Sequence, residues 1–146
     1  MKVVDLAVKE VESILAGATV RECALAMRRK HVGSLVVVDD KNVPVGIITD
    51  RDLAIEVLAQ GLDPEGLSVG EVMTTPVAVA QEEENVIDAL ARLRERGVRR
   101  LPVVDAEGRL SGIVTSSNLL EELSMELDSL VRAVKASHTR EAETRP

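Results

Sequence analysis

The chain repeats itself at a spacing of 66 residues, and this repeat limits the possible fold more than any other feature. The segment from Val45 to Leu53 reads V-G-I-I-T-D-R-D-L, and the segment from Ser111 to Leu119 reads S-G-I-V-T-S-S-N-L. The two copies align without a gap from residues 2 and 68 to residues 53 and 119. Glycine, threonine and apolar positions stay in register, so we infer a duplicated structural unit.

A unit of under about 70 residues buries only a marginal core by itself, so we expect the two halves to pack against each other. The predicted boundaries are a first repeat at 2–60, a linker at 61–67 and a second repeat at 68–136. Residues 137–146 are polar, and we expect them to form a disordered tail.

Hydrophobic patterning predicts the same element order in both repeats: an extended segment, a helix, two strands and a second helix. In the first repeat the strands are expected at 33–38 and 43–48, and a loop this short forces them to pair antiparallel. The last helix begins near Ser116 and meets no stop signal until about Ala136, so it is longer than its counterpart at 50–60. The predicted fold class is α/β (α+β), with two small, mostly antiparallel sheets and two helices on each.

Composition excludes several classes of function. The net charge is −7, and acidic residues outnumber basic ones in both halves, which argues against a nucleic-acid interface or a polybasic membrane patch. The sequence shows no secretory signal and no apolar run of membrane-spanning length, so we expect a cytoplasmic protein. The chain has no Phe, Tyr or Trp, so a bound purine would have to be enclosed by aliphatic side chains.

The repeated motifs resemble a tandem pair of cystathionine-β-synthase (CBS) domains, also called a Bateman module. The resemblance rests on V-G-S-L-V-V-V-D and G-I-I-T-D-R-D-L in the first half, and on L-P-V-V-D and G-I-V-T-S-S-N-L in the second. It implies two halves about a pseudo-two-fold axis, enclosing two clefts that bind AMP, ADP, ATP or S-adenosylmethionine. It also implies a homodimer and a regulatory role for a stand-alone module, read by an effector protein. In this family catalysis belongs to attached domains, so we expect no enzymatic activity and no required cofactor.

Within this resemblance, Thr49 and Asp52 are the leading candidate site residues. The family's matching acidic residue binds the ribose hydroxyls, and the matching threonine helps to hold a phosphate beside a helix N-terminus. The same two residues also have the spacing of a helix capping box, which explains them without a ligand. The two roles are compatible.

The resemblance adds further residues to this cleft. Arg99 and Arg100 correspond to the basic residues that reach the ligand phosphate, although solvent-facing arginines would fit the pattern equally well. Pro76, Val77 and Ala78 would line the adenine, while Ile47 and Pro102 would supply aliphatic cover. For Ile47 and Val77, burial in the core explains the residue in either case.

The second cleft is expected to bind less tightly. Its residues would be Thr115, Asn118, Val11 and Ile113, and Asn118 replaces the family's acidic residue with an amide, a poorer acceptor for two hydroxyls. The matching positions for the arginines are Gly33 and Ser34, which carry no charge.

No catalytic constellation or metal site emerges from the remaining residues. His31 and His138 have no second ligand at useful spacing, and Cys23 lies on an apolar helix stripe, as expected for an unreactive core thiol. The alternative to a nucleotide sensor is a ligand-free scaffold, in which the repeat and the long last helix serve only dimerisation or protein interaction.

Overall fold

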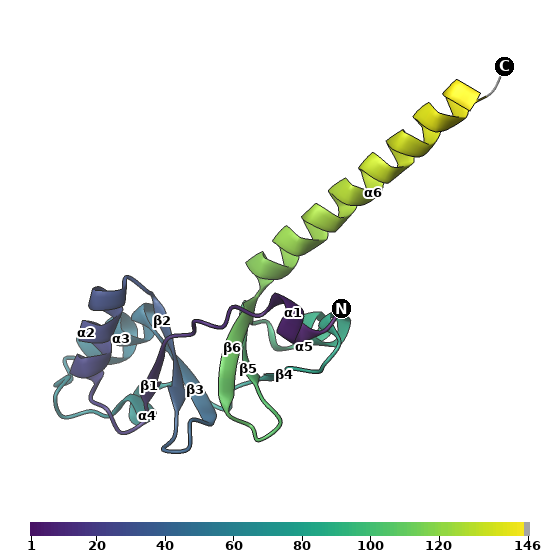
Figure 1. The fold of residues 1–146 in the computed structure, drawn as a ribbon. Coiled ribbons are helices and arrows are strands. Elements are labelled where there is room, and N and C mark those ends of the chain that lie inside the picture. The colour runs from purple at the N-terminus through teal and green to yellow at the C-terminus, as the bar shows by residue number, and fades with distance from the viewer. Residues whose placement is uncertain (145–146) are drawn as a thin grey trace.

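A computed structural model describes residues 1–144 and contains two small sheets that lie side by side, with helices on their outer sides (Figure 1). The elements of the first repeat are α1 (Val3–Leu6), β1 (Ser13–Leu15), α2 (Val20–Lys30), β2 (Ser34–Val38), β3 (Pro44–Thr49), α3 (Asp50–Leu53) and the π-helical turn η1 (Ala54–Leu58). Those of the second are α4 (Val69–Val72), β4 (Ala80–Gln81), α5 (Val86–Arg96), β5 (Arg100–Val104), β6 (Leu110–Thr115) and α6 (Ser116–Thr144).

Each sheet has three strands, in the orders β1-β2-β3 and β4-β5-β6. The hairpin pairs β2/β3 and β5/β6 are antiparallel as predicted, whereas β1 and β4 add to β2 and β5 in parallel. The sheets are therefore mixed, and the predicted α+β pair of repeated units is confirmed.

The lead-in helices α1 and α4 are exchanged between the halves. Val3 of the first repeat is fully buried in the core of the second half, and Val69 of the second repeat is fully buried in the core of the first. The backbone contacts match: the Val3 amide donates to Glu84 at 2.8 Å, and the Val69 amide donates to Ala18 at 2.8 Å. In Figure 1, α1 accordingly lies beside α5 and α4 lies under β1.

Glycines make this exchange possible at two equivalent positions. A Cβ atom on Gly46 would lie 2.9 Å from the carbonyl oxygen of Thr74, and one on Gly112 would lie 2.9 Å from that of Val8. The next residue in each strand forms a bridge there, because Ile47 exchanges backbone hydrogen bonds with Thr74. Each half thus receives a segment of the other along the edge of its outer strand.

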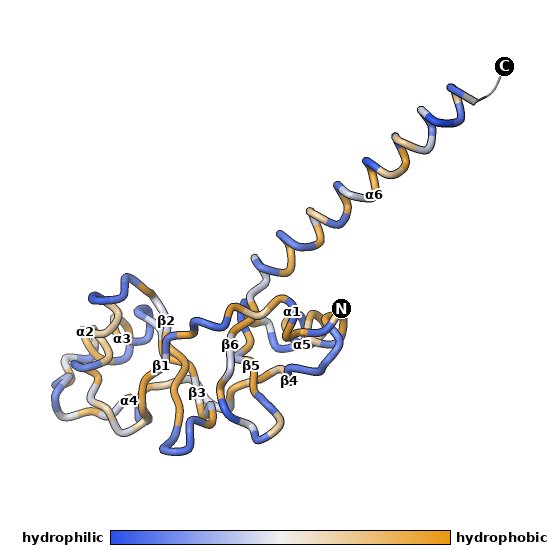
Figure 2. The backbone as a smooth tube through the Cα atoms, viewed as in Figure 1, coloured by the Kyte–Doolittle hydropathy of each residue, from blue (hydrophilic) through white to orange (hydrophobic). Residues whose placement is uncertain are grey.

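The C-terminal helix corrects one prediction. Residues 137–144, expected to be disordered, continue α6 to Thr144; a disordered state expected for residues 145–146 lies outside the described residues. The segment contains no glycine or proline to end the helix, and the Thr139 hydroxyl donates to the Lys135 carbonyl at 3.0 Å. The tube in Figure 2 shows apolar residues recurring along this projecting helix.

Candidate functional site

One cavity of about 370 Å³ lies where the two halves meet. The first repeat contributes Ile47 and Thr49 from the end of β3, and the second repeat contributes the segment before β4 and the start of β5. The complete lining is Ile47, Thr49, Thr74, Pro76, Val77, Ala78, Gly97, Val98, Arg99 and Arg100. The volume falls within the usual range for small-molecule pockets.

Seven of the nine residues predicted for the main cleft line this cavity: Ile47, Thr49, Pro76, Val77, Ala78, Arg99 and Arg100. Pro102 does not, because it lies in the central strand of its sheet and its side chain is fully buried. Asp52 also lies outside, in the lining of an adjoining cavity of about 350 Å³ that shares Thr74 with the first.

Thr49 and Asp52 form a complete capping box at the start of α3. The Asp52 carboxylate accepts a hydrogen bond from the Thr49 amide at 2.9 Å, and the Thr49 hydroxyl accepts one from the Asp52 amide at 3.1 Å. A carboxylate has about four acceptor sites, so this single bond leaves capacity for ligand hydroxyls. Thr49 and Asp52 therefore cap the helix, and the Asp52 carboxylate still has unoccupied hydrogen-bond acceptor sites.

The two arginines differ in their surroundings. Arg99 is exposed at the cavity, while Arg100 is half-buried and donates from Nη1 to the hydroxyl oxygen of Ser34 in the first repeat. Arg99 is therefore the guanidinium with freedom to meet an anionic group, and Arg100 joins the two halves.

The equivalent cavity on the other side of the pseudo-two-fold axis has about 280 Å³ and a different chemistry. Glu10 and Glu12 stand where Pro76 and Ala78 stand in the main cavity, and Gly33 and Ser34 stand at the positions equivalent to the arginines, while Arg100 itself lines this cavity as well. Val11 and Ile113 line it as predicted, whereas Thr115 and Asn118 do not. The latter two form the corresponding helix cap, with the Asn118 side-chain oxygen accepting from the Thr115 amide at 3.2 Å.

Sequence reasoning missed three residues of the main cavity, namely Thr74, Gly97 and Val98. Gly97 and Val98 immediately precede the arginines, so extending that segment by two residues would have found them. Thr74 reaches the cavity only through its bridge to Ile47, for which the sequence carries no local signal.

An ion pair supports the wall that Val77 and Ala78 form. Arg92 on α5 donates from Nη1 to Glu84 Oε2 at 2.9 Å and to the Val79 carbonyl at 2.8 Å. Its hydrogen bond holds the pKa of the Glu84 carboxyl below its ordinary value. Arg92 thereby ties the segment before β4 to the helix behind it.

The remaining reactive side chains of residues 1–144 include one buried thiol and no metal-binding cluster. Burial, with a further contribution from the Asp52 charge, raises the pKa of the Cys23 thiol to about 11, which keeps it unreactive. Across residues 1–144, no three His, Cys, Asp or Glu side chains lie together as metal ligands would. Within the same range, no helix combines the length and apolar character that a bilayer crossing requires.

The family model for the CBS domain matches the chain twice, at residues 3–59 and 69–125. The chain belongs to the CBS domain family. Its two matches make it a CBS pair, in agreement with the repeat and with the two equivalent half-folds.

Relatives of this CBS pair occur in bacteria and archaea. Hypoxic response protein 1 of Mycobacterium tuberculosis is 34% identical over 118 residues, which cover 81% of this chain and 80% of that protein. Protein MK0525 of Methanopyrus kandleri is 42% identical over 103 residues, covering 70% of this chain. The match spans only 53% of that archaeal protein's length.

Solved CBS pairs share the fold. The CBS domain pair of protein MJ0100, in complex with methylthioadenosine and S-adenosylmethionine, has a TM-score of 0.72 at 28% identity and covers 86% of this chain and 98% of that one. CBSX2 in complex with AMP has a TM-score of 0.71 at 29% identity, covering 87% and 98%. Hypoxic Response Protein I with two coordinated zinc ions has a TM-score of 0.76 at 30% identity, covering 84% and 98%.

Proposed function

We propose that this CBS pair is a regulatory module that binds an adenosine-containing ligand, such as AMP, ADP, ATP or S-adenosylmethionine, in the cavity between its halves. One observation carries the proposal: a single cavity joins the aliphatic wall of Val77 and Ala78 to Thr49 at a helix start and to the exposed Arg99. An aliphatic wall suits a purine, and a helix N-terminus with a guanidinium suits a phosphate. The adenosine compounds in two solved CBS pairs support this choice of ligand.

The site is built for regulation, because both halves contribute to it. A ligand that touches Thr49 of one repeat and Arg99 of the other stabilises the arrangement in which the halves are closed together. The ligand-bound arrangement is then recognised by an effector protein. We propose a non-catalytic, cytoplasmic role, with the ligand as a signal and no required cofactor.

The other cavity favours anions less. Its lining includes Arg100 but not Arg99, and the charge of Glu10 repels phosphate, whereas the charge of Glu12 is offset by its ion pair with Lys30. We propose that it is the weaker site, so that one nucleotide per chain binds first.

Calorimetry with AMP, ADP, ATP and S-adenosylmethionine at up to millimolar concentration tests the proposal. Replacing Val77→Asp places a carboxylate on the purine wall and should weaken binding at least tenfold, whereas the equivalent Val11→Asp change in the other cavity should leave it intact. The absence of Phe, Tyr and Trp gives a second readout, since a purine that co-purifies would be visible in the near-ultraviolet without subtraction.

Absence of heat with all four compounds would refute the proposal and favour a ligand-free scaffold. Asp52→Ala separates the two functions further. A scaffold predicts only the loss of a helix cap, about 1 kcal/mol in the free energy of unfolding. A sensor predicts a loss of ligand affinity as well, which the equivalent Asn118→Ala change should not cause.

A further inference from the structure

The outer part of α6 extends away from the body of the protein as a bare helix (Figure 1). The helix packs on the body at its start, where Leu119 is buried, but every residue from Leu123 to Glu143 is exposed. The CBS domain model ends at residue 125. Most of α6 (Ser116–Thr144), which is called the arm below, therefore lies beyond the part of the chain that the family model matches.

Large apolar residues follow one face of the arm at alternating spacings of three and four. They are Leu120, Leu123, Leu127, Leu130 and Val134, and their exposed fractions lie between 49% and 70%. This spacing is the a/d pattern of a coiled-coil seam, sustained over two heptads. The seam is roughly 21 Å long, from a rise of 1.5 Å per residue.

Such a seam is not stable in water without a partner. Helical arms outside a packed body owe most of their stability to burial of an apolar face, and contiguous exposed apolar surface marks an interaction site. The heptad spacing specifies a helix as the covering element, because knobs on one helix need holes on another.

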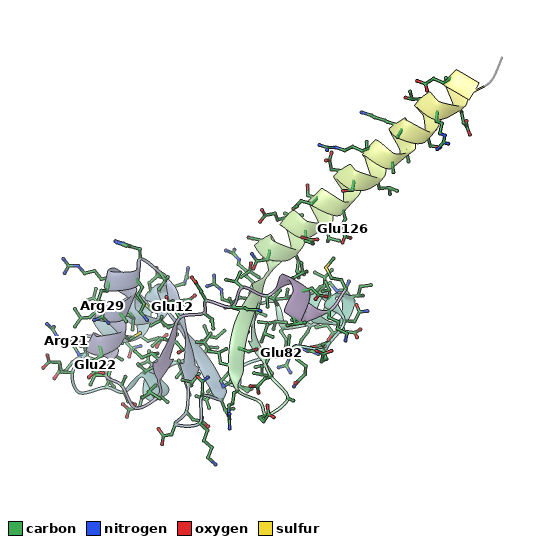
Figure 3. The ribbon with its side chains drawn as sticks, in the orientation of Figure 1. Glu12, Arg21, Glu22, Arg29, Glu82 and Glu126 are labelled. Atoms are coloured by element: carbon green, nitrogen blue, oxygen red, sulfur yellow. The ribbon has the colours of Figure 1, made fainter. Side chains whose placement is uncertain are left out.

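The charges of the arm specify which helix covers it. The first part, 116–131, carries four acidic residues and no basic one, whereas the segment 132–143 carries three basic and two acidic residues. The residues are Glu121, Glu122, Glu126 and Asp128 in the first part, then Arg132, Lys135, Arg140, Glu141 and Glu143 in the second. Asp128 and Arg132 form an ion pair at 3.1 Å where the two segments meet. Figure 3 shows Glu126 on the acidic part, near the body.

We propose that a second copy of the chain covers this seam, with the two α6 arms antiparallel and crossing near Leu127. With the crossing at Leu127, an antiparallel pair places Glu121 and Glu122 of each arm beside Arg132 of the other, whereas a parallel pair would place each acidic residue beside its own copy. The two bodies then lie at opposite ends of the helical pair, and the nucleotide cavities stay accessible. This inference does not depend on the proposed ligand.

Sedimentation of the full-length chain tests the pairing. We expect a dimer that Leu127→Glu weakens at least 100-fold, because it places two carboxylates together at the crossing point. Met125→Glu is the matched control: Met125 is also exposed, but lies about 160° around the helix from Leu127, so the same charge should leave the dimer intact. A monomeric parent chain, or a dimer that Leu127→Glu does not weaken, would overturn the proposal.

Disulfide trapping tests the direction of the helices, and the buried Cys23 can remain in place. In an antiparallel pair the two copies of residue 120 stand roughly 21 Å apart, beyond the reach of about 6 Å that a disulfide allows. Leu120→Cys alone should therefore not cross-link, whereas an equimolar mixture of Leu120→Cys and Val134→Cys chains should. Efficient cross-linking of Leu120→Cys with itself would show parallel helices and refute the antiparallel arrangement.

Discussion

Arg100 donates a hydrogen bond from Nη1 to the hydroxyl oxygen of Ser34, and the two residues hold equivalent positions in the two repeats. Each starts the central strand of its sheet, so the bond connects the halves close to their pseudo-two-fold axis. Arg100 also lines both cavities, so this one side chain connects them.

A double-mutant cycle of Arg100→Ala and Ser34→Ala should give a coupling free energy of about 0.5–1.5 kcal/mol. The bond is half-buried, so solvent weakens it only in part. Urea unfolding of the four proteins measures the coupling. Additive effects of the two substitutions would mean that the bond does not hold the halves together.

Arg99→Ala should reduce affinity for nucleotides by about tenfold, which corresponds to 1.4 kcal/mol. The loss should grow from AMP to ATP and be absent for adenosine, because the guanidinium meets phosphate rather than purine. Calorimetry provides the measurement, and Arg96→Ala, an exposed change at the end of α5, provides the control. An equal loss of affinity for adenosine and for ATP would mean that Arg99 does not contact the phosphates.

Gly46→Ala should lower the free energy of unfolding by about 1–3 kcal/mol, the usual cost of overpacking. The added Cβ would lie 2.5 Å from Met73 Sδ and 2.9 Å from the Thr74 carbonyl oxygen, which is backbone. Gly17→Ala is the control, since nothing lies within 4 Å of its Cβ position. Equal stability of the two variants would show that the strand edge is not tightly packed.

The pair formed by Glu84 and Arg92 should make stability depend on pH in the acid range. The pKa of Glu84 is lowered in the folded state, so its contribution is present above the ordinary value of 4.5 and is lost as the pH falls through the folded pKa. Urea unfolding from pH 7 to pH 3 should show a parent chain that is more stable than Glu84→Gln at pH 7, with the difference shrinking below pH 4.5.

The same substitution at exposed Glu107 serves as the control for this pH series. It should follow the parent chain across the whole range. A stability difference between the parent chain and Glu84→Gln that stays constant down to pH 3 would contradict the role of the carboxylate charge.

The repeat was the strongest source of correct prediction. Positions that keep register over a duplication specify strands, turns and helix starts twice, so local errors are corrected by the second copy. The expectation that Thr49, Val77 and Arg99 line one cleft followed from the resemblance to the CBS family. Asp52 was located correctly at the helix start, but the direction of its side chain is set by capping, which sequence cannot distinguish from ligand contact.

The exchange of α1 and α4 could not be predicted, for a physical reason. Val3 and Val69 are apolar in both repeats, and either would bury equally well on its own sheet or on the other. The helical state of 137–144 was missed because polarity was read as disorder, although helix propensity depends on backbone and side-chain entropy rather than on hydropathy.

The exchanged lead-in helices also set an order of events during synthesis. The first half of the chain cannot complete its core when its own residues have been made, because Val69 has yet to leave the ribosome. Val3 can be buried only after the sheet that ends at Thr115 has been made. A chain that ends within the second repeat therefore leaves the hydrophobic cores of both halves incomplete.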